Sequence, residues 1–179
     1  ELVARLPADP QLLVVRVEQC HDAAVRASGV LDVDLAAHLG RVFGCAAVAR
    51  RSADRPADTL DARRGQHSSS AILRWLAQAF PRQRTLAVTD VDLFLPVLTF
   101  VFGEAQLGGR AAVMSLARLT EAADPARVVA RSAKEAVHEL GHTFGLVHCA
   151  TRACVMSRSP ALAAVDTKTD RLCADCRVR

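Results

Sequence analysis

One segment, His138–Cys149, constrains this chain more than any other, because its letters HELGHTFGLVHC place three histidines at the spacing H-E-x-x-H-x-x-G-x-x-H. The chain has 6 histidines and 9 glycines among 179 residues. With glutamate as rare as histidine, random placement would produce this spacing on the order of once in 10⁷ windows. The spacing therefore indicates a set of metal ligands rather than chance.

On an α-helix this spacing has a direct geometric meaning. Residues four apart lie on one face, so His138 and His142 present nitrogens to one point. Gly145 is predicted to end the helix, since glycine adopts positive φ without steric penalty, and His148 then returns as a third ligand. Three protein ligands with an open fourth position are typical of catalytic zinc. Glu139, rotated by about 100° from the first histidine, is predicted to lie beside the metal without binding it.

The limits of this helix can also be predicted. Asp124 and Pro125 are typical of an N-cap and a first helical residue. The apolar residues form one stripe: Val129, Ala133, Val137, Leu140 and Phe144. The two helical histidines lie roughly 160° from this stripe, so one face is predicted to pack on a core while the other faces a cleft.

Four cysteines follow the third histidine in two clusters, Cys149 with Cys154 and Cys173 with Cys176. This spacing can close a tetrahedral zinc site. The alternative is two disulfides, for which three pairings exist. We favour metal, because nothing else in the sequence indicates secretion.

Met156 lies eight residues after His148, where a tight turn could pass beneath the histidines. With this methionine included, the pattern from His138 to Cys176 resembles that of the archaemetzincin family of zinc metallopeptidases. The segments Val88–Pro96 and Phe100–Leu119 are similar to that family as well.

The resemblance implies one archaemetzincin-like peptidase domain over residues 1–179, with an α+β fold and an α/β-like element order. Residues 1–145 would form a metzincin-like mixed, twisted β-sheet packed with helices, including the active-site helix. Residues 146–179 would form a small C-terminal zinc-binding subdomain with the third histidine, the Met-turn and the cysteine site.

The resemblance also assigns roles to individual residues. The catalytic zinc would be held by His138, His142 and His148, with Glu139 as general base and Met156 as the Met-turn. A second, structural zinc would be held by four cysteines: Cys149, Cys154, Cys173 and Cys176. The implied activity is hydrolysis of peptide bonds by a zinc-activated water.

Two other functions fit a similar site: a zinc hydrolase acting on a non-peptide amide, and a non-catalytic zinc-stabilised binding module. Glu139 argues against the second, because a structural site has no use for a general base. Metzincin-like sites often carry a tyrosine near the metal, and this chain has none. The developing oxyanion would then need another donor, such as an arginine or a backbone N–H.

Composition limits the partners. The length fits one domain, and no apolar run reaches the roughly 18 residues that cross a bilayer. The net charge of +4 comes from dispersed arginines, and the 4% of aromatic residues are too few for a base-stacking surface. We therefore expect a monomer that binds peptide or protein substrates, without nucleic-acid or membrane partners. Six cysteines and a thiolate metal site favour the reducing cytoplasm.

Hydrophobic patterns predict five strands, over Leu12–Val17, Cys45–Arg50, Thr85–Thr89, Phe100–Phe102 and Ala111–Leu116. They predict helices over Ala23–Phe43, with a break near Gly29 and a cap at Asp32 or Asp34, and over Ser68–Phe80. Between them, Arg51–His67 is predicted to be a surface loop. Phe100–Glu104 is the best candidate for an exposed edge strand that could pair with a peptide.

The remaining polar candidates have structural interpretations. Asp90 and Asp92 fit turn or cap positions as well as a site, and we assign them no catalytic role. Cys20 and Cys45 are expected to be buried free thiols. The other histidines lack ligand spacing and are expected to be structural or exposed: His21, His38 and His67.

Overall fold

The main sheet has five strands in the order β2-β1-β5-β8-β7. The computed structural model describes residues 12–17, 29–52 and 56–178. The strands are β1 (Leu12–Val17), β2 (Ala47–Ser52), β5 (Arg84–Thr89), β7 (Gly103–Ala105) and β8 (Ala111–Ser115). Neighbouring strands are parallel except for β7, which runs antiparallel to β8 and forms one edge of the sheet.

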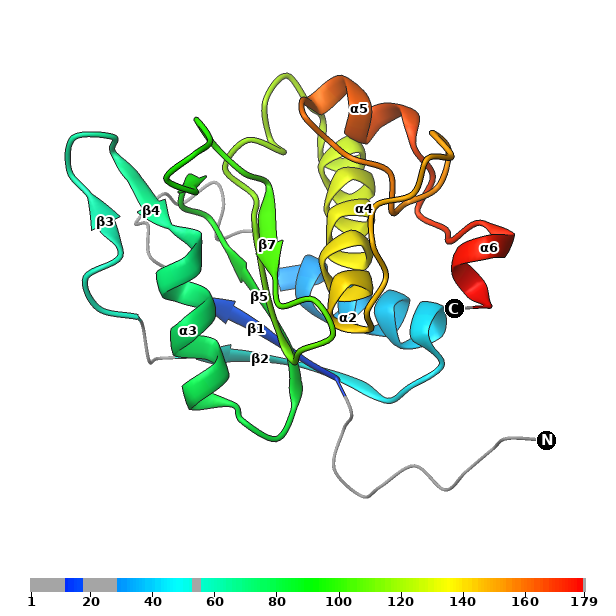
Figure 1. Cartoon of the computed structure of the whole chain (residues 1–179), viewed down its shortest axis with the longest axis horizontal. Coiled ribbons are helices and arrows are strands. Elements are labelled where there is room, and N and C mark those ends of the chain that lie inside the picture. The colour runs from blue at the N-terminus through cyan, green and yellow to red at the C-terminus, as the bar shows by residue number, and fades with distance from the viewer. Residues whose placement is uncertain (1–11, 18–28, 53–55, 179) are drawn as a thin grey trace.

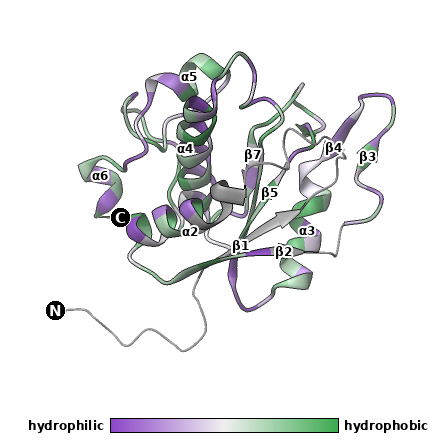
Figure 2. Ribbon diagram, turned by 180° about the vertical axis from the view of Figure 1, so that it is seen from behind, coloured by the Kyte–Doolittle hydropathy of each residue, from purple (hydrophilic) through white to green (hydrophobic). Residues whose placement is uncertain are grey.

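Helices cover both faces of this sheet (Figures 1 and 2). Helices α2 (Gly29–Phe43) and α4 (Pro125–Thr143) lie on one face, and α3 (Ser69–Ala79) lies on the other. Successive strand residues point to opposite faces. Leu86 and Val88 therefore pack with α2 and α4, while Ala87 packs with α3. Burial on both faces explains why the central strands are almost entirely apolar.

A second, smaller sheet lies beside α3, with strands β3 (Leu60–Asp61), β4 (Gln66–Ser68) and β6 (Leu93–Phe94) in that order. Its first two strands fall within the predicted surface loop, so that prediction is wrong over these residues. Such short strands are too brief to leave an alternating pattern in the sequence.

Most predicted elements are confirmed within a few residues, and two details are wrong. The predicted strand Phe100–Phe102 is displaced, since only Val101 pairs there, through an isolated bridge to Leu93, and the strand itself is β7. The predicted caps Asp32 and Asp34 lie inside α2. The predicted helical residues before Gly29 lie outside the described residues.

The C-terminal segment carries α5 (Leu162–Thr167) and α6 (Ala174–Arg177) and packs beside α4 (orange to red in Figure 1). Its buried side chains, including Val165 and Met156, belong to the same hydrophobic core as α2 and α4. Among the described helices, none has the length and hydropathy needed to span a membrane.

Candidate metal centres

Helix α4 begins and ends where its sequence predicts. The Asp124 side chain accepts a hydrogen bond of 2.8 Å from the N–H of Arg127, and Pro125 is the first helical residue. After Thr143 the chain leaves the helix, and Gly145 adopts φ of 89°. A residue with a side chain would be strained at this φ, so glycine allows the sharp turn toward His148.

The buried face of α4 differs from the predicted stripe. Val137 and Leu140 are fully buried, but Val129 is 47% exposed and Phe144 is 44% exposed. The histidine face is covered as well, because His138 is only 5% exposed. The C-terminal segment lies over this face, a long-range contact that a helical pattern cannot reveal.

The three motif histidines converge. The Nε2 atoms of His138 and His142 lie 3.2 Å apart, and one nitrogen from each of the three rings lies within 4.8 Å of the others. Zinc–nitrogen bonds of about 2.0–2.1 Å in a tetrahedron separate two nitrogens by about 3.3 Å. The two helical histidines thus fit a zinc ion closely, and His148 lies within reach of the same centre.

Backbone carbonyls fix the orientation of the helical pair. His138 Nδ1 lies 2.8 Å from the oxygen of Val155, and His142 Nδ1 lies 2.7 Å from that of Leu146. A carbonyl only accepts, so each Nδ1 carries the ring proton and each Nε2 presents a lone pair. Two lone pairs facing each other at this distance favour a cation between them.

Full or partial loss of solvent favours the neutral form of these rings. Desolvation, followed by the positive charge of Lys168, lowers the pKa of His138 to about 3. Desolvation also lowers the pKa of His142 and of His148. Neutral imidazole is the form that binds metal, so protons compete little for these nitrogens at neutral pH.

The third histidine has a different environment. His148 is exposed, and its Nδ1 accepts a hydrogen bond of 3.2 Å from Nε of Arg158. This arginine could not be selected from its place in the sequence, because its contact with the histidine spans ten residues of irregular chain.

Glu139 follows His138 on α4 and is also buried, with 5% of its surface exposed. Desolvation, and then the nearby carboxylate of Glu135, raises its pKa well above the usual value. Strand β7 passes directly beside it. A Cβ on Gly103 would lie 2.6 Å from the Cγ atom of Glu139, so only glycine allows this approach.

A buried ion pair, also not predicted, lies one helical turn before Glu139. Lys168 Nζ lies 2.7 Å from a carboxylate oxygen of Glu135, and both side chains are almost fully buried. Ser159 bridges them, accepting from Lys168 at 2.7 Å and donating to Glu135 at 3.1 Å. The pair ties the C-terminal segment to α4.

Met156, the predicted Met-turn residue, lies against the helix that carries the first two histidines. It is fully buried, and its thioether lies against the backbone of Gly141, where any Cβ would collide with it. Its carbonyl oxygen accepts a hydrogen bond of 2.9 Å from the N–H of Cys149, the residue after His148.

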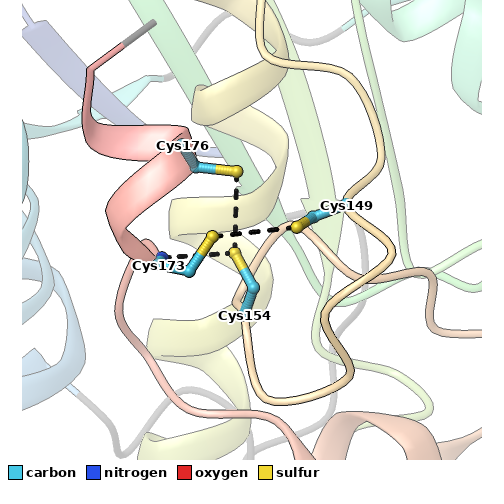
Figure 3. A group of neighbouring side chains, drawn as sticks. All are labelled: Cys149, Cys154, Cys173 and Cys176. Atoms are coloured by element: carbon cyan, nitrogen blue, oxygen red, sulfur yellow. Dashed lines mark hydrogen bonds between the residues drawn. The ribbon is translucent and has the colours of Figure 1, made fainter.

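The four C-terminal cysteines point toward one another (Figure 3). The Sγ atoms of Cys149 and Cys173 lie 3.8 Å apart, as do those of Cys154 and Cys176. Zinc–sulfur bonds of about 2.3 Å in a tetrahedron place two sulfurs about 3.8 Å apart, whereas a disulfide needs about 2.05 Å. The four thiols are free, so the structure does not contain the alternative disulfides.

A backbone hydrogen bond favours a thiolate in this cluster. The N–H of Thr151 donates to Sγ of Cys149 at 3.4 Å and lowers its pKa to about 7. The N–H of Cys173 donates to Sγ of Cys154 at 3.4 Å, but burial outweighs this hydrogen bond and raises the pKa of Cys154. Thiolate is the form that binds zinc.

Some polar residues were predicted to have no catalytic or metal-binding role, and those that the structure describes are placed as follows. His67 shares a hydrogen bond of 2.8 Å with Thr59. Asp92 is paired with Arg118 at 2.8 Å, and Cys45 is a half-buried free thiol. Cys20 and His21 lie outside the described residues.

Comparison with known proteins agrees with this geometry. The model of peptidase family M54 matches residues 75–179. The archaemetzincin of Methanopyrus kandleri is 42% identical over 140 residues, which cover 78% of this chain and 79% of that protein. The chain belongs to peptidase family M54, the archaemetzincins.

Solved archaemetzincins have the same fold. The crystal structure of the M. kandleri protein has a TM-score of 0.81 at 37% identity and covers 92% of this chain and 89% of that one. A zinc-dependent peptidase from Methanocorpusculum labreanum has a TM-score of 0.76 at 26% identity and covers 93% and 98%. The predicted family, the mixed α+β fold and the zinc metallopeptidase class are thereby confirmed.

Proposed function

We propose that this archaemetzincin hydrolyses peptide bonds with a zinc ion held by His138, His142 and His148, and with Glu139 as the general base. The single observation that carries the proposal is the facing pair of Nε2 lone pairs, 3.2 Å apart. Both rings are locked by carbonyls in the tautomer that binds metal. Without a metal ion, two facing lone pairs would repel each other and would not stabilise the helix.

When bound, zinc would lower the pKa of a coordinated water from 15.7 to about 7 and polarise the substrate carbonyl. Glu139 would accept the proton from this water and return it to the leaving nitrogen. Burial raises its pKa above the usual value, which strengthens the carboxylate as a proton acceptor.

Strand β7 is the proposed docking edge for the peptide. It is the edge strand on the active-site side of the sheet, and its Gly103 lies against Glu139. A peptide that adds to this edge through backbone hydrogen bonds would pass next to the metal centre. Such binding depends little on side chains, which suits a peptide or protein substrate.

We assign a second, structural zinc to Cys149, Cys154, Cys173 and Cys176. Metal binding to four thiolates contributes folding free energy, because the unfolded chain offers no preformed site. Free thiols of this kind persist in a reducing compartment, so the proposal includes a cytoplasmic location. The peptidase would act as a monomer, since both sites are formed within one chain.

Replacing Glu139 tests the general base. Glu139→Gln should lower hydrolysis of a peptide library by about 10²–10⁴-fold while two zinc ions per chain are retained, measured by mass spectrometry of products and by elemental analysis. Glu121→Gln, a change at an exposed carboxylate, is the matched control and should leave activity unchanged. Full activity of Glu139→Gln would end the assignment.

A further inference from the structure

Arg158 places a permanent positive charge beside the catalytic centre. It follows Met156 by two residues and is exposed. Its Nε lies 3.2 Å from Nδ1 of His148, so the guanidinium lies against the ring of the third proposed metal ligand. The positive charge of this guanidinium opposes the binding of a zinc ion to the histidines, unless an anion neutralises it.

No carboxylate of the described residues forms an ion pair with Arg158. The carboxylates around the centre have other roles: Glu135 is paired with Lys168 at 2.7 Å, and Glu104 accepts hydrogen bonds from Ser70 at 3.0 and 3.1 Å. Glu139 is the proposed base.

Two other arginines of this chain are neutralised in a planar, two-bond geometry, whereas several exposed ones among the described residues form no ion pair. Arg118 donates to both oxygens of Asp92, each at 2.8 Å, and Arg131 does the same to Asp166. This fork is the geometry in which a guanidinium recognises a carboxylate most strongly. Arg158 has the same donors. Among the described residues, its side chain donates a hydrogen bond only to a ring nitrogen of His148.

Metal binding would remove even that acceptor. A neutral imidazole that binds metal through Nε2 carries its proton on Nδ1, and arginine has donors only. The hydrogen bond between Arg158 and His148 cannot persist in that tautomer. The guanidinium would then lie next to the metal centre without an anionic partner from the described residues.

We propose that Arg158 binds a carboxylate of the peptide substrate next to the cleaved bond. The inference rests on the proposed function and names its substrate class, which is peptides with a negative charge close to the scissile bond. This carboxylate is either the C-terminal carboxyl group or an Asp or Glu side chain. Both present the same two-oxygen acceptor to the guanidinium.

Matched peptides test the inference. One sequence is prepared with a free or an amidated C-terminus, and with Asp or Asn beside the cleaved bond. The wild-type enzyme should cleave one or both carboxylate forms with the higher kcat/KM, and the preferred pair identifies the source. Arg158→Leu should reduce kcat/KM for that form by about 10–100-fold, as expected for loss of charge-assisted hydrogen bonds, and leave the neutral form within about twofold.

Three variants control this experiment. Arg158→Lys retains the charge but not the fork, so it should restore part of the preference. Arg74→Leu removes an exposed arginine of α3 and should change nothing. Glu139→Gln allows the affinity for uncleaved peptides to be measured by calorimetry, and adding Arg158→Leu to it should abolish the difference between carboxylate and neutral forms.

The outcomes separate the two proposals. Equal cleavage of charged and neutral peptides by the wild type, with Arg158→Leu unchanged, overturns the inference and leaves the peptidase assignment intact. No cleavage of any peptide overturns the peptidase assignment, and calorimetry with zinc-loaded Glu139→Gln then still decides the role of Arg158. Equal affinity for both forms in that variant contradicts the inference by itself.

Discussion

Gly103 and Glu139 approach each other more closely than any side chain at position 103 would allow. A Cβ there would lie 2.6 Å from the Cγ atom of Glu139 and 2.7 Å from its Cδ atom. The carbonyl oxygen of Val113 would also lie 2.6 Å away, so β7 cannot move toward β8 to make room. The glycine therefore sets where the carboxylate of Glu139 lies.

Gly103→Ala should displace that carboxylate. A misplacement of about 1 Å at a reacting group costs about 10²-fold in rate, so we expect a fall in kcat of that order with both zinc ions retained. Gly40→Ala is the matched control. Gly40 lies in α2, and the nearest atoms to its Cβ would belong to Cys45, whose carbonyl oxygen would lie 2.9 Å away, and to Ala47 rather than to Glu139. This substitution should lower stability and leave kcat unchanged. Unchanged kcat in Gly103→Ala would contradict this role.

At this scale the sequence predicted residues whose contacts are local. His138, His142 and Glu139 are related by one helical turn, and Gly145 by the turn that follows, so their spacing in the sequence carries their geometry. Arg158 depends on how irregular loops pack, and no periodic pattern records such contacts.

At the scale of elements, α4 is attached to the C-terminal segment by the buried pair of Glu135 and Lys168. Two buried charges stabilise a fold only when each remains compensated. Here Ser159 supplies a further hydrogen bond to each partner. The pair therefore fixes the segment between Met156 and Cys173 against the active-site helix.

A double-mutant cycle tests this attachment. Lys168→Met leaves the Glu135 carboxylate buried without its cation, and we expect a loss of about 3–5 kcal/mol in the free energy of unfolding. The double variant with Glu135→Leu should recover much of that loss. Lys134→Met removes the ammonium of a half-buried lysine from the carbonyls of Val165 and Asp166. It should lower the free energy of unfolding by less than Lys168→Met does. Denaturant unfolding measures these variants and Glu135→Leu alone, and additive effects of the two single changes in the double variant would contradict the pairing.

Element prediction succeeded where caps and long apolar runs define an element. Asp124 and Pro125 begin α4 as expected, and β1 matches its predicted range. The predicted strand Phe100–Phe102 lies before the observed three-residue strand β7. Pairing with β8 determines which residues form β7, and a hydrophobic pattern contains no information on that pairing.

At the scale of the whole molecule, the two metal centres are adjacent in the chain. His148 belongs to the histidine cluster and Cys149 to the cysteine cluster, and the N–H of Cys149 donates to the carbonyl of Met156. The cysteine cluster thus adjoins the loop that presents the third histidine. The sequence predicted both clusters by their spacing but not this contact, which requires the folded C-terminal segment.

The proposed metal content is one catalytic zinc bound by three histidines and a second zinc bound by four cysteines. Anomalous scattering at the zinc edge from crystals of the purified enzyme tests it most directly. We predict two peaks per chain, one among His138, His142 and His148 and one among the four sulfurs, and loss of only the first peak in His142→Ala. A wild-type crystal grown with zinc that shows no peak among the histidines would contradict the account.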